Sequence, residues 1–266
     1  MTKRNGFAIS TIGSSHIRKN ICCQDKSGYF GNSKYSAIVV CDGHGSEKHF
    51  RSNIGASLAV SIVKELLDSF SELVIKETAI NRCLIRMKEL EKNIIYHWRK
   101  AVESYMESNP FIDSELCLLN DANKREVLQN FFLAYGTTFL CVAEIGNFVY
   151  IVQLGDGNCV LVKDNSIVFP VETDDRLKFN FTTSLCADDA FNNIRDKVLP
   201  VEAGTIFVLT SDGVYNSFEN EEAYVDFVKT VCENTASNEL NTELQDFLPK
   251  LSKNGSGDDV SLAILF

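Results

Sequence analysis

The chain has 266 residues, of which 45% are hydrophobic and 23% are charged, and its formal net charge is -10. These proportions are ordinary for a soluble globular protein with a substantial core. An acidic chain without a cluster of Lys and Arg is a poor partner for nucleic acids or anionic membranes, so we expect neither. The N-terminus lacks the apolar segment of a secretory signal, and no apolar run approaches the roughly 18 residues of a membrane span. We therefore expect a cytoplasmic protein.

The nine cysteines indicate reduced, structural thiols. Their number is odd, several lie inside apolar strands, and none forms a Cys-x-x-Cys pair, which argues against a disulfide framework or a zinc site. No cysteine has an Arg six positions later, so the phosphate loop of the thiolate phosphatases is excluded. The Gly-Lys-Ser/Thr string of a nucleotide-binding P-loop is also absent.

In the first half of the chain, apolar periodicity predicts strands over residues 7–12 and 27–41 and helices over 46–70 and 72–107. Ser46 is the expected N-cap of the first helix, because a serine hydroxyl can accept a bond from an unpaired backbone N–H. Asn109-Pro110 ends the second helix. Residues 111–133 allow either a short helix or an irregular connection.

From residue 135 the apolar period changes to two. The pattern predicts strands over 137–145, 148–154, 159–162, 204–210 and 260–266, and a helical segment over 221–251. Gly146-Asn147 joins the first two strands as a hairpin, and the third strand continues the meander. Residues 164–200 are polar and irregular, and we expect a mobile flap there. Strand clusters that alternate with helical blocks favour an α+β fold, in which helices cover antiparallel sheets.

Four apolar runs carry an aspartate at one end. Three of them end in Asp42-Gly43, Asp156-Gly157 and Asp212-Gly213, and the fourth begins with Asp258-Asp259. Carboxylates at the tips of buried strands would repel one another if they met, unless cations occupied the space between them. The pattern therefore indicates a hard-metal site and metal-assisted hydrolysis. Asp-Gly is also a strong hairpin signal, and we expect a turn at Asp156-Gly157 in either case.

The string Cys41-Asp42-Gly43-His44-Gly45 resembles the signature of the metal-dependent Ser/Thr protein phosphatases, the PPM or type 2C family. Further pieces resemble family motifs in the same order, namely Gln24-Asp25, Gly136-Thr137-Thr138, Gly155-Asp156-Gly157, Ser211-Asp212-Gly213 and Gly257-Asp258-Asp259. Any one of these motifs is weak, but together and in order they are specific. The resemblance covers nearly the whole chain and predicts a single domain over residues 1–266.

The resemblance implies a four-layer αββα sandwich with two Mn²⁺ or Mg²⁺ ions at one edge. The ligands that it implies are Asp42 as the bridge, the Gly43 carbonyl on one ion, Asp212 and Asp258 on the other, Asp156 at an additional weaker position, and Asp25 as a direct ligand or a residue that orients bound water. A water activated by both ions would attack phosphorus in line, and His44 would protonate the leaving oxygen. The alternative for His44 is a turn residue between two glycines.

Several positions depart from the family pattern. Gln24 replaces a Glu, Asn158 stands where an Arg often follows, and Asp259 replaces an Asn. These changes indicate a divergent, bacterial branch of the family. The domain carries a long helical block at about 46–133. The part around 72–133 is longer than a minimal member needs, and that extra surface could bind a partner.

The family places an Arg before its acidic pair to grip the substrate phosphate. Arg18 is the natural candidate here, since its guanidinium can hold a phosphate through two parallel bonds. His16 and Lys19 are its rivals.

We therefore predict a Mn²⁺- or Mg²⁺-dependent phosphatase of phosphoserine and phosphothreonine, acting on a Ser/Thr kinase or on the targets of that kinase. The first alternative is a pseudophosphatase that serves as a binding or regulatory module, which the presence of Asp42 and Asp212 argues against. A phosphohydrolase acting on small phosphoesters is the second, and only substrate profiling separates it from the main prediction. A non-catalytic metal-binding structural protein is the third.

Overall fold

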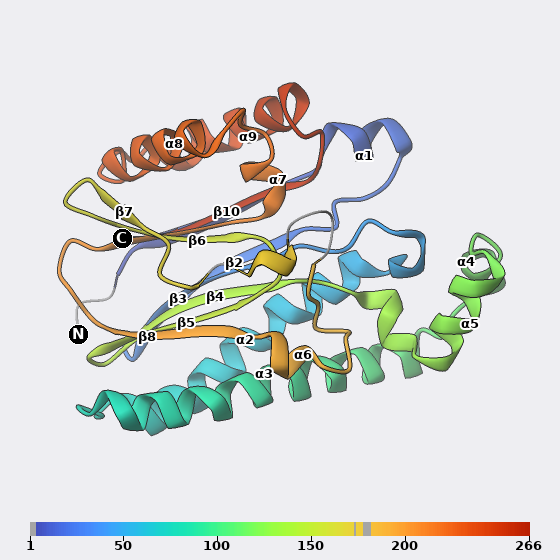
Figure 1. Cartoon of the computed structure of the whole chain (residues 1–266), viewed down its shortest axis with the longest axis horizontal. Coiled ribbons are helices and arrows are strands. Elements are labelled where there is room, and N and C mark those ends of the chain that lie inside the picture. The colour runs from blue at the N-terminus through green and yellow to red at the C-terminus, as the bar shows by residue number, and fades with distance from the viewer. Residues whose placement is uncertain (1–3, 173, 178–181) are drawn as a thin grey trace.

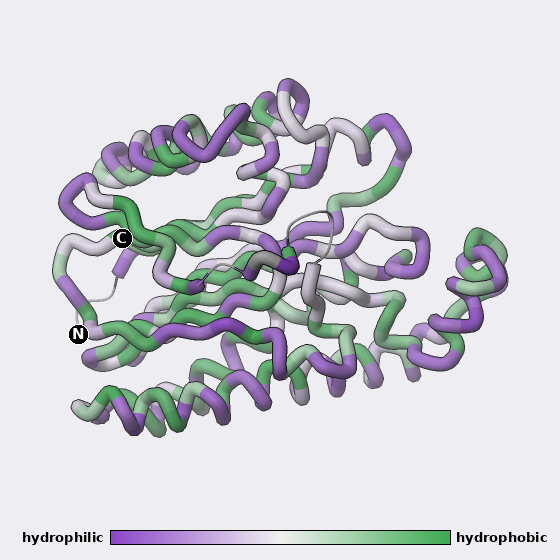
Figure 2. Tube along the Cα trace, viewed as in Figure 1, coloured by the Kyte–Doolittle hydropathy of each residue, from purple (hydrophilic) through white to green (hydrophobic). Residues whose placement is uncertain are grey.

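The computed structural model describes residues 4–172, 174–177 and 182–266. Two five-stranded antiparallel sheets form the inner layers of a four-layer αββα sandwich, and helices cover both outer faces (Figure 1). Hydrophobic residues concentrate in the strands, whereas the outer helices alternate between hydrophobic and hydrophilic positions (Figure 2). The predicted fold class is confirmed.

The sheets are built from strands that lie far apart in the sequence. One sheet has the order β1 (Gly6–Thr11), β10 (Val260–Leu265), β9 (Ile206–Thr210), β6 (Asn158–Lys163) and β7 (Ser166–Val168). The other has the order β2 (Lys26–Gly31), β3 (Tyr35–Cys41), β4 (Phe139–Ile145), β5 (Phe148–Leu154) and β8 (Arg195–Pro200). Their facing sides form one apolar cluster that includes Ile38, Val142, Ile151, Phe207 and Leu209.

Long helices cover the outer faces of the sheets. α8 (Glu221–Glu233) and α9 (Leu240–Asn254) lie on the first sheet, and α2 (Ser52–Val74) and α3 (Ile80–Ser108) lie on the second (Figure 1). The shorter helices are α1 (Ser14–Lys19), η1 (Glu47–His49), α4 (Asp113–Leu116), α5 (Asp121–Gln129), η2 (Phe131–Tyr135), η3 (Asp175–Leu177), α6 (Ala190–Asn193) and α7 (Asp212–Tyr215). In the described part of the chain, no helix has the length and apolarity needed to cross a membrane.

The helix predicted to begin after Ser46 begins at Ser52 instead. Residues Glu47–His49 form a 3₁₀ turn, and the Ser46 side chain makes no capping bond. The cause is tertiary: the backbone N–H of Arg51 donates to the Ala134 carbonyl at 2.8 Å, which holds the chain outside the helical path until α2 starts.

The strand predicted over residues 27–41 is a hairpin of β2 and β3. The Asn32 side-chain oxygen accepts bonds from the backbone N–H groups of Lys34 and Tyr35, at 2.7 and 3.1 Å. This local turn chemistry breaks the apolar run into two strands.

β6 does not continue the meander, because it belongs to the other sheet. The crossing depends on two glycines. Gly155 has φ +108°, and a Cβ at Gly157 would lie 2.7 Å from the Thr210 carbonyl oxygen. The turn expected at Asp156-Gly157 therefore joins the two sheets and is not a hairpin.

The segment 164–200, predicted as an irregular flap, contains β7, η3, α6 and β8. β8 is an edge strand that pairs with β5 alone, so its outward side chains are polar and its strand pattern is weak. Residues 173 and 178–181 of the predicted flap lie outside the described residues.

Candidate metal centre and active site

A cavity of about 690 Å³ opens at one end of the sandwich, and four of the predicted aspartates line it: Asp42, Asp156, Asp212 and Asp258. Strand direction explains their convergence. β3 and β5 both run antiparallel to β4, so their C-terminal ends lie at the same end of the sheet. Each of the two strands is followed by an aspartate. β9 ends where its antiparallel neighbour β10 begins, which brings the other two aspartates together.

The turn at Asp42 is fixed by the two threonines that precede β4. The Asp42 backbone N–H donates to Thr138 Oγ1 at 2.9 Å, and its carbonyl accepts from Thr137 Oγ1 at 2.9 Å and from the Thr138 N–H at 2.8 Å. Gly43 forms an isolated bridge with Thr137. These bonds hold the Asp42 backbone rigid at the rim of the cavity.

Asp212 begins the short helix α7, and it accepts a hydrogen bond from the Asn216 side chain at 3.1 Å. A Cβ at Gly213 would lie 2.0 Å from the Asp259 carbonyl oxygen. Only glycine therefore lets α7 approach the start of β10, where the Asp258 side chain is 55% exposed.

Asp25 is only 1% exposed and is close enough to Asp42 and Asp212 for their charges to interact. Its Oδ2 atom has no hydrogen-bond partner among the described residues. Burial, reinforced by the charge of Asp259, raises the pKa of Asp25 to about 7. A buried carboxylate oxygen without a partner is costly unless a cation or a water satisfies it.

The carboxylates that line the cavity also repel one another when they are ionised. Burial and the charges of Asp25 and Asp212 raise the pKa of Asp42 well above its usual value. Burial and Asp212 raise the pKa of Asp156 to about 6, and the same two causes raise that of Asp258. The electrostatics of the cavity thus favour either protons or bound cations.

This donor set fits hard divalent cations, which prefer carboxylate and carbonyl oxygens. The unpartnered oxygen of Asp25 and the mutual repulsion of the carboxylates both support the fit. In the described part of the chain, no group of three His, Cys, Asp or Glu side chains is arranged so that it could hold a metal ion as it stands. The residues that line the cavity therefore match such ions in the chemistry of their donor atoms.

His44 and His49 both line the cavity, and their rings contact each other. Burial, followed by the charges of His49 and Lys48, lowers the pKa of His44 to about 3, and burial also lowers the pKa of His49. His49 Nδ1 contacts the Leu133 carbonyl oxygen, so this nitrogen carries the proton of the neutral ring. Both imidazoles are therefore neutral near pH 7 in the protein alone.

The sequence prediction did not single out His49. Its only signal was its position five residues after His44, inside a segment predicted as helix. Thr182 and Ser184 also line the cavity, and Ser184 Oγ accepts a bond from the Thr137 N–H at 3.1 Å. These residues reach the cavity because segments that are distant in the sequence lie side by side in the folded chain.

α1 supplies positive charge at the cavity rim. Lys19 and His16 line the cavity. Arg18 is exposed and is not among the lining residues, although its guanidinium lies near Gly257, the residue before Asp258. Whether Arg18 grips phosphate stays a prediction.

Asp259 is a structural residue of the site and is 3% exposed. Its two oxygens accept bonds from the backbone N–H groups of Gly13 and Gln24, both at 2.6 Å, and one of them lies 3.0 Å from His16 Nδ1. An asparagine has only one side-chain oxygen and could not accept both bonds in the same way. The need for two acceptor oxygens explains why Asp259 replaces an Asn. The bond from Gln24 anchors the segment that carries Asp25.

Comparison with known proteins identifies a family and a common fold. The family model for protein phosphatase 2C matches residues 12–249. Among curated proteins, no sequence matches.

Several solved phosphatases share the fold. The catalytic domain of the serine threonine protein phosphatase PstP, in complex with two manganese ions, superposes with a TM-score of 0.60 at 14% identity, over 99% of this chain and 98% of the other. PstP/Ppp of Mycobacterium tuberculosis gives 0.62 at 12% identity, over 99% and 98%. The serine/threonine phosphatase of S. agalactiae gives 0.60 at 19% identity, over 99% of both chains. These identities show a common fold, and the family match shows that the chain belongs to the protein phosphatase 2C family.

Proposed function

We propose that this protein hydrolyses phosphoserine and phosphothreonine in proteins and that it depends on two Mn²⁺ or Mg²⁺ ions. The observation that carries the proposal is the convergence of Asp42, Asp156, Asp212 and Asp258 on one cavity, with Asp25 buried beside them, in a chain of this family. Its substrates would be phosphoproteins, including a Ser/Thr kinase or the targets of such a kinase. The free cysteines of the described chain support action in the cytoplasm.

Each carboxylate has a proposed role. Asp42 would bridge the two cations, the Gly43 carbonyl would bind one of them, and Asp212 and Asp258 would bind the other. Asp156 would serve a weaker third position, and Asp25 would bind directly or orient water. When bound, the cations would activate a water for attack on phosphorus and neutralise charge on the phosphoryl oxygens.

His44 is the proposed general acid. It follows the Asp42-Gly43 turn and lines the cavity, so it can give a proton to the serine or threonine oxygen as the bond between phosphorus and oxygen breaks. In the protein alone its ring is neutral, because burial lowers its pKa. A phosphate dianion in the cavity would raise that pKa and let the ring carry the proton that it donates.

The substrate phosphate would be held by the positive charge of α1. Lys19 is better placed than Arg18, since its side chain lines the cavity. We expect Lys19→Ala to raise KM for a phosphothreonine peptide about ten-fold, equivalent to roughly 1.4 kcal/mol. The same substitution at Arg18 should raise it less, and the opposite order would restore Arg18 as the phosphate-gripping residue.

The function is tested by phosphate release from a phosphothreonine peptide, with Mn²⁺ and then with excess EDTA. Release that requires the metal would support the proposal, and a panel of small phosphoesters run alongside would separate a protein phosphatase from a general phosphohydrolase. No release with Mn²⁺ or Mg²⁺, from protein shown by circular dichroism to be folded, would favour the pseudophosphatase alternative.

A further inference from the structure

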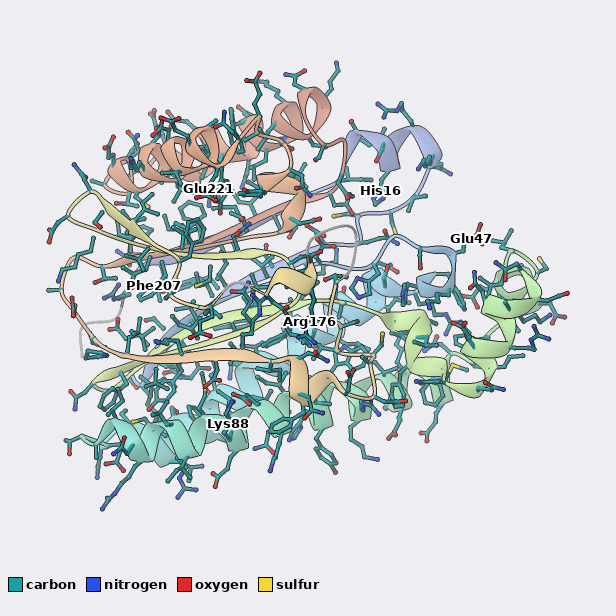
Figure 3. All side chains as sticks on the ribbon, viewed as in Figure 1. His16, Glu47, Lys88, Arg176, Phe207 and Glu221 are labelled. Atoms are coloured by element: carbon teal, nitrogen blue, oxygen red, sulfur yellow. The ribbon has the colours of Figure 1, made fainter. Side chains whose placement is uncertain are left out.

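A second cavity, of about 390 Å³, lies between the two sheets at the end away from the aspartates. Its walls include Val149 at the start of β5 and Phe207 at the start of β9, whereas the opposite ends of these strands lead to Asp156 and Asp212. Figure 3 labels Phe207 between the two sheets. The edge strands β7 and β8 complete the walls.

The walls of this cavity are mostly apolar, with Val149, Leu161, Phe169, Pro170, Leu199 and Phe207 among the lining residues. Protein cores are normally packed without voids of this size, and 300–1,000 Å³ is the usual range of small-molecule sites. The strand β7 has only three residues, so it covers little of this edge. Val168 on β7 is 48% exposed, which leaves an apolar side chain at the mouth.

A buried hydroxyl in the wall has no partner. Thr205 lines the cavity and is only 5% exposed, and its Oγ1 atom makes no hydrogen bond among the described residues. Its carbonyl, by contrast, accepts a bond from the Arg4 guanidinium. An unpaired buried hydroxyl costs about 1–3 kcal/mol, so this position suits a ligand with a polar atom next to an apolar body.

The free charge at the mouth is positive. Glu202 lines the cavity, but it is paired with Lys163 at 2.5 Å. Asp196, which precedes Lys197 on β8, is paired with Lys88 at 2.8 Å. Lys197 lines the cavity and is exposed, and it has no ion-pair partner among the described residues.

We propose that this cavity is a second binding site, which takes a small organic anion with an apolar body. The body would fill the space between the sheets, the anionic group would meet Lys197 at the mouth, and a polar atom of the ligand would pair with the Thr205 hydroxyl. The proposal is independent of the phosphatase reaction, because none of these residues lines the aspartate cavity.

The test uses the full chain and 8-anilinonaphthalene-1-sulfonate, which combines apolar rings, one N–H group and an anionic group. Fluorescence titration should show saturable binding of one probe per protein. Lys197→Glu should weaken this binding at least ten-fold, and Thr205→Val should weaken it at least three-fold. Decanoate should displace the probe, whereas decylamine should not, because only the acid carries the charge that Lys197 attracts.

The matched control is Lys250→Glu, which makes the same charge change in a different apolar groove, between α8 and α9. It should leave probe binding within two-fold of wild type. The proposal is overturned if binding does not saturate, if Lys197→Glu binds like wild type, or if Lys250→Glu causes the larger loss. Circular dichroism and the Tm of each variant confirm that the compared proteins are folded.

Discussion

The imidazole rings of His44 and His49 lie edge to face, with their centroids 4.9 Å apart. Gly136 makes this arrangement possible, since a Cβ there would lie 2.5 Å from His49 Nδ1 and 2.7 Å from a carbon of the His44 ring. The Gly136 carbonyl also accepts a bond from the His44 N–H at 3.1 Å. The glycine that opens the Gly-Thr-Thr motif thus leaves room for both rings and fixes the backbone of one of them.

The role of His44 is tested by the leaving group. His44→Ala should slow the hydrolysis of an alkyl phosphoester or a phosphothreonine peptide about 10²–10⁴-fold, the usual range for general acid catalysis. It should slow the hydrolysis of an aryl phosphate far less, because an aryl oxide leaves without a proton. His49→Gln is the comparison variant, because it replaces the neighbouring ring and leaves the His44 imidazole in place. Equal losses of kcat on both substrates in the His44 variant would argue against general acid catalysis.

Asp212→Asn should abolish metal-dependent turnover while the protein stays folded. The substitution keeps the size of the side chain but removes a charge, which would weaken cation binding. Mn²⁺ should raise the Tm of the wild type, because a ligand that binds only the folded state stabilises it, and it should raise that of the variant less. Asp246→Asn, at an exposed position on α9, is the matched control. Near-normal turnover in the Asp212 variant would remove this residue from the metal site.

In the absence of metal, stability should fall as pH rises from 6.5 to 8.5. The pKa of Asp25 is raised to about 7 in the folded protein, so the folded state holds this proton more tightly than the unfolded chain. Such a group favours folding below its unfolded pKa, and the contribution is lost as pH rises through the folded pKa. His44 and His49, whose pKa values are lowered, act in the opposite direction, but mainly below about pH 6.5, the ordinary value for histidine.

This prediction is checked by urea unfolding in EDTA at pH 6.5 and 8.5. Asp25→Asn carries no charge at either pH, so its free energy of unfolding should change less between the two than that of the wild type. At pH 8.5 the variant should be the more stable protein. A wild type that gains stability over this interval relative to Asp25→Asn would contradict the assignment.

Arg51 connects the loop that carries His44 and His49 to the long helical block. Its guanidinium forms two parallel bonds to Glu115, both 2.7 Å long, and it also donates to Tyr135 Oη at 2.8 Å. The Arg51 side chain is only 8% exposed. Part of the extra helical block therefore supports the loop that carries both histidines.

Arg51→Met should lower the free energy of unfolding by about 3–5 kcal/mol, since it leaves the Glu115 carboxylate partly buried without its partner. Lys100→Met is the control, because its partner Glu103 is exposed and such surface pairs contribute about 0–1 kcal/mol. The double variant Arg51→Met/Glu115→Gln should recover part of the loss. A loss of less than 1 kcal/mol in urea unfolding of the Arg51 variant would show that this buried pair is not a major support.

The sequence alone predicted the fold class and the cavity aspartates. Asp42, Asp156, Asp212 and Asp258 are marked by apolar runs that end or begin with a carboxylate, and this signal is local. Most strands were also visible, because alternating or continuous apolar residues define a strand without reference to its partner. The roles of individual site residues stay predictions until the variants are measured.

The tertiary structure decided which of the residues marked by these local patterns come together. The antiparallel order of β3, β4 and β5 places Asp42 and Asp156 at the same end of the sheet. No pattern within either strand predicts that these two residues come together. The same holds for the start of α2 at Ser52, for the passage of β6 into the other sheet, and for His49 beside His44. Each depends on contacts between segments that are distant in the chain, whereas periodicity reports only what a segment can bury and not which segment it will pack against.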